Sequence, residues 1–250
     1  MLRVKRSTGW IIGALIAAAI SALVWWTAPR AEKPGEPIGL FTTLPILWSE
    51  SPDLSVSLNP AVEPHWAKGV LAATGAIEPI DVLSGPSGQA PLDRVRRLVM
   101  AQPRVLGPQE NVALDQWVRG GGHLLLLADP ALTEESAFPL ADPRRPQAVV
   151  LLSPILNRWG LDLRFDDGQQ LGETSREVMG VAMPVNLPGH FMTRGQANCR
   201  LWADGLAVTC AIGKGRVVAL ADAAVLERED PEGTRAKALK ALLEMAFAAR

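Results

Sequence analysis

The chain carries a long uncharged run near its amino end, and this run constrains the fold more than any other feature. Residues Trp10–Trp26 read WIIGALIAAAISALVWW, and the flanking residues Thr8, Gly9, Thr27 and Ala28 also carry no charge. At 1.5 Å rise per residue, a helix of this length crosses the roughly 30 Å hydrocarbon layer of a bilayer. The run has no polar face to meet water, as a surface helix of a soluble domain would need. We therefore expect a transmembrane helix over residues 10–28.

The charges on either side predict how this helix is oriented. Residues 1–9 hold three cations and no acid, whereas residues 29–37 (PRAEKPGEP) hold two of each sign. The positive-inside rule then places residues 1–9 in the cytoplasm and sends the rest of the chain across. Trp10 and Trp25 stand at the two ends, where indole rings favour the membrane interface. In a bacterium this describes a single-pass protein of the inner (plasma) membrane with a periplasmic, extracytoplasmic domain.

A cleaved signal peptide is the competing interpretation, because it also begins with a basic region and an apolar run. Its apolar core is only about 7–15 residues long, and small residues for cleavage follow closely. Here the run is longer and ends in paired Trp. The nearest candidate, Pro29-Arg30-Ala31, has an unsuitable first residue. The sequence therefore favours an uncleaved anchor, and cleavage stays as the alternative.

The charge balance changes once the amino end is set aside. The whole chain has a formal net charge of −1, but residues 1–38 contribute five cations and two acids, which leaves a net charge of −4 for the remainder. Such a balance provides no general attraction for nucleic acid. We expect a Pro-rich tether over residues 29–37, followed by one extracytoplasmic domain over residues 38–250.

Apolar runs alternate with helical patterns through the first part of this domain. Buried strands are expected at 39–47, 77–83, 98–101, 123–128 and 161–165, with helices at 65–73, 108–119 and 153–159. The helix at 108–119 has the clearest signals, with Gly107 as N-cap, Pro108 at its first position and Gly120–Gly122 after its end. Strands separated by helices predict parallel βαβ units, and so a mostly parallel sheet with helices on both faces.

The carboxyl third has a different pattern. Strands at 199–203, 206–212 and 216–221 are joined by Asp204-Gly205 and by Gly213–Gly215, which predicts antiparallel hairpins added to the α/β domain. An amphipathic helix over residues 234–250 should follow, with an apolar side made of Leu239, Leu242, Leu243 and Ala246.

The first hairpin brings the two cysteines together. If Asp204-Gly205 is a two-residue turn, Cys199 lies directly opposite Cys210, and Leu201 opposite Val208. We expect these side chains, with Ala203 and Leu206, to share one apolar face, and the cysteine pair to occupy a hydrogen-bonded position of the ladder. Opposed residues are within disulfide range. An oxidising compartment would permit a bridge between Cys199 and Cys210, and two buried free thiols are the alternative.

The motifs of common catalytic sites are missing from the sequence. It contains no G-x-S-x-G, P-loop, H-E-x-x-H or C-x-x-C pattern. The three His residues are scattered, and none has a second ligand at metal spacing. Gly120–Gly122 follows a helix, whereas a phosphate cradle precedes one, so helix termination is expected. We therefore expect no catalytic residue, no metal and no cofactor.

Two aspartates are better placed for binding a ligand. Asp129 and Asp222 both follow apolar strands (HLLLLAD and VVALAD), at the edge of an α/β sheet that hosts ligands. An Asp-Pro turn at Asp129 and a helix cap at Asp222 are the simpler alternatives. His190, expected in the loop PGHF, is the third ligand-binding candidate.

Four arginines form a separate basic feature of the sequence. Arg94, Arg96, Arg97 and Arg104 could form an anion-binding face or be ordinary surface charge.

Two blocks of the sequence resemble a known family. Met100–Leu132 (MAQPRVLGPQENVALDQWVRGGGHLLLLADPAL) and Gly213–Glu227 (GKGRVVALADAAVLE) resemble membrane-anchored domains associated with ABC-type transport systems, related to the gliding-motility component GldG. The resemblance implies a flavodoxin-like sheet of the class I glutamine amidotransferase type. It does not supply the nucleophilic Cys of those enzymes, because Cys199 and Cys210 lie within hairpin strands and no G-x-C-x-G turn occurs.

The resemblance implies a non-catalytic accessory module that binds transporter subunits or other membrane proteins. A second hypothesis is a hydrolase-like or sugar-like ligand-binding domain that uses Asp129, Asp222 and His190. Self-association through the anchor is a further option, because Gly13 and Ala17 have small-xxx-small spacing.

Overall fold

The computed structural model describes residues 35–51, 65–86, 89–140, 142–227 and 229–248. The expected transmembrane helix at 10–28 and most of the tether lie outside these ranges. Within them, no helix combines the length and the apolar character that crossing a membrane requires.

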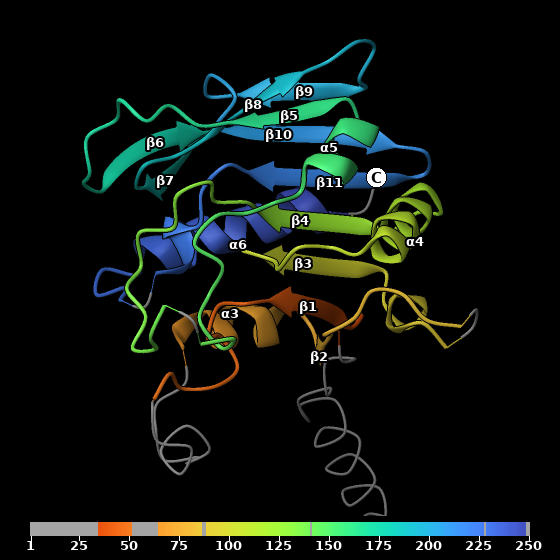
Figure 1. The fold of residues 1–250 in the computed structure, drawn as a ribbon, viewed down its shortest axis with the longest axis horizontal. Coiled ribbons are helices and arrows are strands. Elements are labelled where there is room, and N and C mark those ends of the chain that lie inside the picture. The colour runs from red at the N-terminus through yellow and green to blue at the C-terminus, as the bar shows by residue number, and fades with distance from the viewer. Residues whose placement is uncertain (1–34, 52–64, 87–88, 141, 228, 249–250) are drawn as a thin grey trace, which may run out of the picture. The chain divides into compact units, whose positions relative to one another are not determined.

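A seven-stranded, mostly parallel sheet forms the centre of the fold (Figure 1). Its order is β2-β1-β3-β4-β11-β10-β9. The first five are mutually parallel, and β10 and β9 continue the sheet antiparallel. The strands are β1 (Ile38–Thr42), β2 (Ile77–Pro79), β3 (Arg97–Ala101), β4 (His123–Leu127), β9 (Cys199–Trp202), β10 (Ala207–Ile212) and β11 (Gly215–Leu220). The expected mixed α/β fold with a mostly parallel sheet is thus confirmed.

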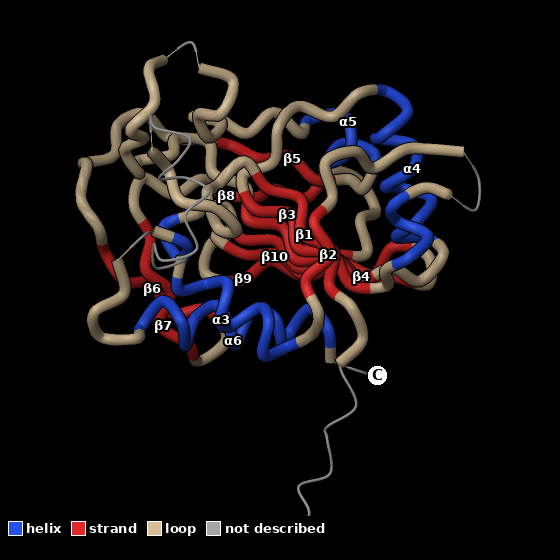
Figure 2. The backbone as a smooth tube through the Cα atoms, turned by 90° about the horizontal axis from the view of Figure 1, so that it is seen from below, coloured by secondary structure: helices blue, strands red, loops and turns tan. Residues whose placement is uncertain are grey.

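Helices cover both faces of this sheet, as Figure 2 shows. One face packs against α4 (Pro108–Arg119), α5 (Ser153–Arg158) and the 3-10 turn η1 (Pro91–Arg94). The other packs against α3 (Trp66–Thr74), α6 (Thr234–Phe247) and the 3-10 turn η2 (Ala224–Leu226). Alternate residues of each central strand enter the two layers: Leu124 and Leu126 face α4, whereas Leu125 and Leu127 face α6. Strands buried on both faces explain the uninterrupted apolar run HLLLLA.

The helix signals of the sequence agree with α4. Glu110 accepts the backbone N–H of Gly107 at 2.9 Å, which closes the amino end, and Pro108 occupies the first turn. The helix stops at Gly120, and Gly121 adopts a left-handed φ of 117° that few other residues tolerate. The glycine triplet therefore terminates a helix, as expected.

The first strands are shorter than their apolar runs. The strand expected at 39–47 ends at Thr42, where the Thr42 hydroxyl accepts the N–H of Leu44 and turns the chain. The strand expected at 77–83 ends at Pro79, and the next residue, Ile80, donates its N–H to the carbonyl of Leu40 at 2.9 Å.

The β9–β10 hairpin has the register deduced from the sequence. Leu201 pairs with Val208, and Cys199 pairs with Cys210. The turn itself is longer than expected, since Trp202 and Ala207 close it and Ala203 and Asp204 have left-handed φ angles. A type I′ geometry at its start keeps the pairing unchanged.

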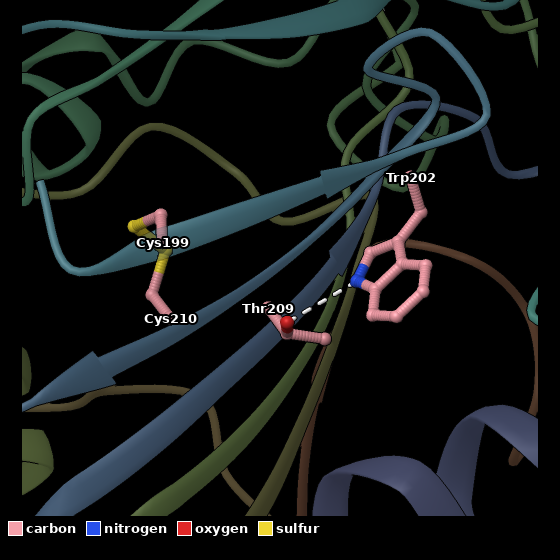
Figure 3. Close-up of a disulfide and its surroundings, with 4 residues drawn as sticks. All are labelled: Cys199, Trp202, Thr209 and Cys210. Atoms are coloured by element: carbon pink, nitrogen blue, oxygen red, sulfur yellow. Dashed lines mark hydrogen bonds between the residues drawn. A yellow bond between two sulfur atoms is a disulfide. The ribbon is translucent and has the colours of Figure 1, made fainter.

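The two cysteines are joined by a disulfide, which Figure 3 shows between β9 and β10. Ala211 donates its N–H to Asn198, so the neighbouring pair is the hydrogen-bonded one. The cysteine pair therefore occupies a non-hydrogen-bonded position, where opposed Cα atoms lie closest, here 4.1 Å apart. The expectation of a hydrogen-bonded position was wrong.

The expected common apolar face of this hairpin is also only partly correct. Val208 and Cys210 face the α4 layer, whereas Ala203 and Leu206 pack in the α6 layer because the turn rotates them. Leu201 lies on the edge strand and is 38% exposed.

Two small antiparallel sheets were not predicted in this form. The strand expected at 161–165 exists as β5 (Leu161–Arg164), but it pairs with β8 (His190–Thr193) and not with the central sheet. Strands β6 (Thr174–Val178) and β7 (Val181–Val185) form the other pair. Consequently His190 begins a strand, and its placement in a loop was wrong.

The final helix, α6, ends at Phe247. It buries the four residues predicted for its apolar side, Leu239, Leu242, Leu243 and Ala246.

Candidate functional site

Asp129 and Asp222 meet at the edge where the parallel strands end. They follow the neighbouring strands β4 and β11, whose last residues, Leu127 and Leu220, are register partners. Asp129 is 1% exposed and Asp222 is fully buried. The structure thus brings together two of the three ligand-binding candidates, at the edge where α/β sheets commonly bind ligands.

Each of these carboxylates accepts two backbone hydrogen bonds. Asp129 accepts the N–H groups of Ala131 at 2.7 Å and Ala223 at 3.1 Å. Asp222 accepts the N–H groups of Ala224 at 2.5 Å and Asn186 at 2.9 Å. Both oxygens of each side chain are therefore engaged, and the pair fastens the loops that follow β4, β7 and β11.

Burial makes both carboxyl groups weak acids. Desolvation raises the pKa of Asp129 to about 6 against the partial compensation of its two N–H donors. Burial, and next the charge of Asp129, raise the pKa of Asp222 to about 8. Glu227 adds a smaller repulsion to both. The folded pair therefore keeps protons at a higher pH than free carboxyl groups do.

This arrangement is suited to holding loops more than to reacting with a substrate. A general acid or base must reach the reacting atom directly or through one water. The Asx turn at Asp129 and the cap at Asp222 match the structural alternatives for these positions.

Gln102 belongs to the same edge and was not predicted. It follows β3, is fully buried and has a left-handed φ of 42°. Its side chain accepts the N–H of Asp129 and donates to the carbonyls of Asp129 and Gln147. A polar residue directly after the buried strand VMA was the available signal, the same one that marks the two aspartates.

His190 is not part of the aspartate pair. Its side chain lines a hollow of about 270 Å³ at the same edge of the sheet, and among the described residues no hydrogen bond joins it to Asp129 or Asp222. The lining of the hollow mixes polar and apolar groups, and its polar residues are Asp166, Gln169, Arg176, His190 and Asp204. Gln169 braces it by donating to the carbonyls of Asp166 and Pro188.

A larger groove, about 630 Å³, runs between α4 and the segment that precedes it. Leu83, Leu92, Val112 and Trp117 form its apolar part. Within the described ranges, no group of three or more His, Cys, Asp or Glu side chains could hold a metal ion.

The four arginines of the basic feature separate in the structure. Arg104 forms a two-pronged pair with Glu110, at 2.8 and 2.9 Å, near the carboxyl ends of the strands. This pair and two backbone donors lower the pKa of Glu110 to about 2. Arg94 pairs with Glu78, whereas Arg96 and Arg97 lie where β3 begins.

Comparison with known proteins adds a distant likeness in structure. No protein-family model and no curated protein matches the chain. An exo-β-1,4-mannosidase from Opitutaceae bacterium strain TAV5 is similar at a TM-score of 0.49 and 15% identity, over 99% of this chain and 40% of that enzyme. A cytoplasmic protein from Salmonella typhimurium has a TM-score of 0.47 and 11% identity, over 84% of this chain and 96% of its own. A ThuA-like protein from Parabacteroides merdae has a TM-score of 0.38 and 10% identity, over 86% and 90%.

Proposed function

We propose that this chain is a membrane-anchored, non-catalytic accessory module of an ABC-type transport system, with a flavodoxin-like domain of the class I amidotransferase type. The anchor is the uncharged run Trp10–Trp26, and the module is the α/β domain that follows it. The strand order β2-β1-β3-β4-β11 matches the 2-1-3-4-5 order of flavodoxin-like sheets and so supports the fold part of the proposal.

The state of the carboxyl edge carries the functional part of the proposal. Enzymes of this architecture place reactive groups at that edge, in contact with substrate. Here Asp129 and Asp222 are buried there, and backbone N–H groups engage all four of their oxygens. Side chains committed to loop structure favour a module that binds a partner over one that turns over a substrate.

Affinity purification of the tagged full-length protein from detergent-solubilised membranes tests this proposal. We expect the nucleotide-binding and membrane-spanning subunits of a transporter to co-purify and to be identified by mass spectrometry. The same tag on an unrelated single-pass protein provides the background. Recovery of no transporter subunit above that background would remove the main support for the proposal.

The hollow around His190, with its mixed polar and apolar lining, favours a second candidate function, the binding of a small sugar-like ligand. Asp166, Asp204, Arg176 and His190 present charged and hydrogen-bonding groups to a space of about 270 Å³, at the ligand-binding edge of the sheet. Hydroxyl groups of a sugar are suited to such mixed donors and acceptors.

Titration of the full-length protein with a panel of monosaccharides, followed by NMR of the sugar signals, tests this candidate. We expect line broadening that is lost in Asp204→Ala and His190→Ala. Glu78→Gln, at a half-buried site on β2 outside the lining of the hollow, is the control and should bind as the parent does. Broadening that survives both hollow variants would place the binding elsewhere.

A further inference from the structure

Cations collect at the edge of the sheet where the strands begin, opposite the aspartate pair. Arg97 and Arg216 are in register with His123 on either side of it, so the first residues of β3, β4 and the start of β11 form a basic row. Helix α4 ends at Arg119, next to the turn before β11. The edge where β3, β4 and β11 begin lies on the right of Figure 1. The row therefore gathers side chains from three consecutive elements, β3, α4 and β4, and from β11, which lies about 90 residues later.

The glycine turn after α4 lies between two further cations, Arg96 and Lys214. A side chain placed on Gly121 would lie 3.2 Å from the Arg96 guanidinium and 3.9 Å from Lys214. Lys214 in turn donates its backbone N–H to the carbonyl of Arg119 at 3.0 Å. We call the set Arg96, Arg97, Arg119, Lys214 and Arg216 the amino-edge patch.

Few carboxylates neutralise the amino-edge patch. Arg119 pairs with the buried Asp115, which also binds Arg158, and Glu36 lies 3.9 Å from Arg97. Among the described residues, no carboxylate forms an ion pair with Arg96 or Lys214, and both are exposed. The exposed positive charge of the patch therefore comes mainly from Arg96 and Lys214, whereas the Arg97 side chain is only 14% exposed.

The positive charge of the amino-edge patch is opposite in sign to the net charge of the domain. Residues 39–250 carry a net charge of −4, and exposed acids such as Asp166, Asp167 and Asp204 lie toward the carboxyl edge. The amino-edge patch thus differs in sign from the net charge of the whole domain, and an anionic surface would attract this edge first.

The chain also enters the domain at the amino edge. The described residues begin at Gly35, three positions before β1, and the first residue of β1, Ile38, is in register with Arg97. Residues 29–34 separate Ala28, the last residue of the expected transmembrane helix, from Gly35. Fully extended, this stretch of chain spans roughly 25 Å. A membrane that holds the uncharged run would then lie within this distance of the amino edge.

We propose that the amino-edge patch docks the domain on the anionic phospholipid headgroups of the membrane to which the chain is tethered. The proposal rests on the membrane anchor of the proposed function. Attraction between exposed charges is screened within about 8 Å at physiological salt, so the short tether matters because it keeps the patch at contact range. Docking would turn the carboxyl edge, with the His190 hollow, away from the lipid.

Hydrogen–deuterium exchange of the full-length chain in lipid nanodiscs tests the docking. We expect backbone amides at 119–123 and 213–216 to exchange several-fold more slowly in nanodiscs that contain phosphatidylglycerol than in nanodiscs of phosphatidylcholine alone. The difference should disappear at high salt. Equal exchange in the two lipids would overturn the proposal.

A pair of charge-reversal variants provides the matched comparison. Arg96→Glu combined with Lys214→Glu should abolish the lipid-dependent protection. Arg176→Glu combined with Lys237→Glu changes the net charge by the same amount at exposed sites away from the patch, and should retain it. Protection that persists in the first double variant would contradict the docking.

The same samples separate this proposal from the proposed function. A chain that fails to enter nanodiscs disproves the anchor, and the docking with it. A chain that enters nanodiscs but shows no lipid-dependent protection disproves the docking alone. Protection of the patch that requires a transporter subunit, with no difference between lipids, would show that the patch binds protein and would also overturn the docking.

Discussion

The carboxylate of Asp129, which follows β4, accepts the backbone N–H of Ala223, the residue directly after Asp222. Through this bond the carboxyl end of β4 holds the turn that ends β11, while Asp222 holds Asn186 beyond β7. Two buried acids thus connect segments that are distant in the sequence. Their ionisation is linked to the stability of the whole carboxyl edge.

We expect the free energy of unfolding to decrease as the pH rises from about 4 to about 8. The folded-state pKa values, about 6 for Asp129 and about 8 for Asp222, exceed the 3.8 of the unfolded chain. The folded protein therefore holds more protons in this window, and raising the pH favours unfolding. Each pKa unit corresponds to about 1.4 kcal/mol, so the loss amounts to several kcal/mol. Urea denaturation across the window measures it.

Asp222→Asn isolates one member of the pair. Asparagine does not ionise, so we expect the free energy of unfolding of this variant to change less with pH above about pH 6 than that of the parent. Its amide nitrogen would face one of the two backbone N–H donors, so the variant should be less stable at low pH by about 1–3 kcal/mol. If the free energy of unfolding falls with pH as steeply in the variant as in the parent, Asp222 does not titrate in this range.

Glu110 should have the opposite dependence on pH. Its bonds with Arg104 lower its folded-state pKa from 4.5 to about 2. Its contribution to stability is therefore complete above about pH 4.5 and is lost as the pH falls toward 2. Glu110→Gln should destabilise the protein by about 1–3 kcal/mol at neutral pH, because the buried N–H of Leu83 and the Arg104 guanidinium lose a charged acceptor.

Glu78→Gln is the control for Glu110. Glu78 pairs with Arg94 at 2.9 Å, but the Arg94 side chain is 62% exposed, so solvent screens the pair. Its loss should change the unfolding free energy by less than about 1 kcal/mol. Equal effects of the two substitutions would mean that burial of Glu110 contributes nothing.

Removal of the disulfide should loosen the edge of the sheet. Cys199→Ala combined with Cys210→Ala removes the bridge that closes a short loop. By the chain-entropy model this lowers the free energy of unfolding by about 3 kcal/mol, because the unfolded chain gains freedom. We expect faster hydrogen exchange in β9, at the edge of the sheet, than in β4 at its centre. The bridge itself is checked by mass spectrometry after alkylation with and without reductant, and an unchanged count of alkylated thiols would argue against it.

Two charges within the uncharged run should release the chain from membranes. Leu15→Lys combined with Ala18→Lys places both cations near the centre of the expected span, at a cost of about 3 kcal/mol each. We expect the protein to move from the alkali-resistant membrane fraction to the soluble or degraded fraction. Substitution of Arg30 and Lys33 by Gln, outside the run, should leave it membrane-bound. Retention of the Lys variant in the membrane fraction would contradict the anchor.

Local patterns in the sequence were sufficient for most of the central sheet. The apolar run HLLLLA, the Pro108 start of α4 and the register of Cys199 with Cys210 depend on neighbouring residues alone, and all were confirmed. The aspartate pair was accessible for the same reason, because parallel strands end at one edge.

Which strands pair with one another could not be deduced from local patterns in the same way. The pattern of β5 is that of any short strand, and nothing local indicates that it pairs with β8 in place of the central sheet. Strand β6 (TSREV) is exposed along most of its length, so it lacks the alternation that marks a half-buried strand. The amino-edge patch likewise joins residues of β3, α4 and β11 whose proximity follows only from the topology.

The pairing of β4 with β11 has a consequence for how the chain acquires its structure. Leu124 aligns with Val217, about 90 residues later, so the most apolar strand has no neighbour on one side until nearly all of the domain has emerged. Contacts at such sequence separation form slowly, and an open apolar strand edge invites pairing with other chains. The period before residues 215–220 are available is therefore when this protein most needs protection from aggregation.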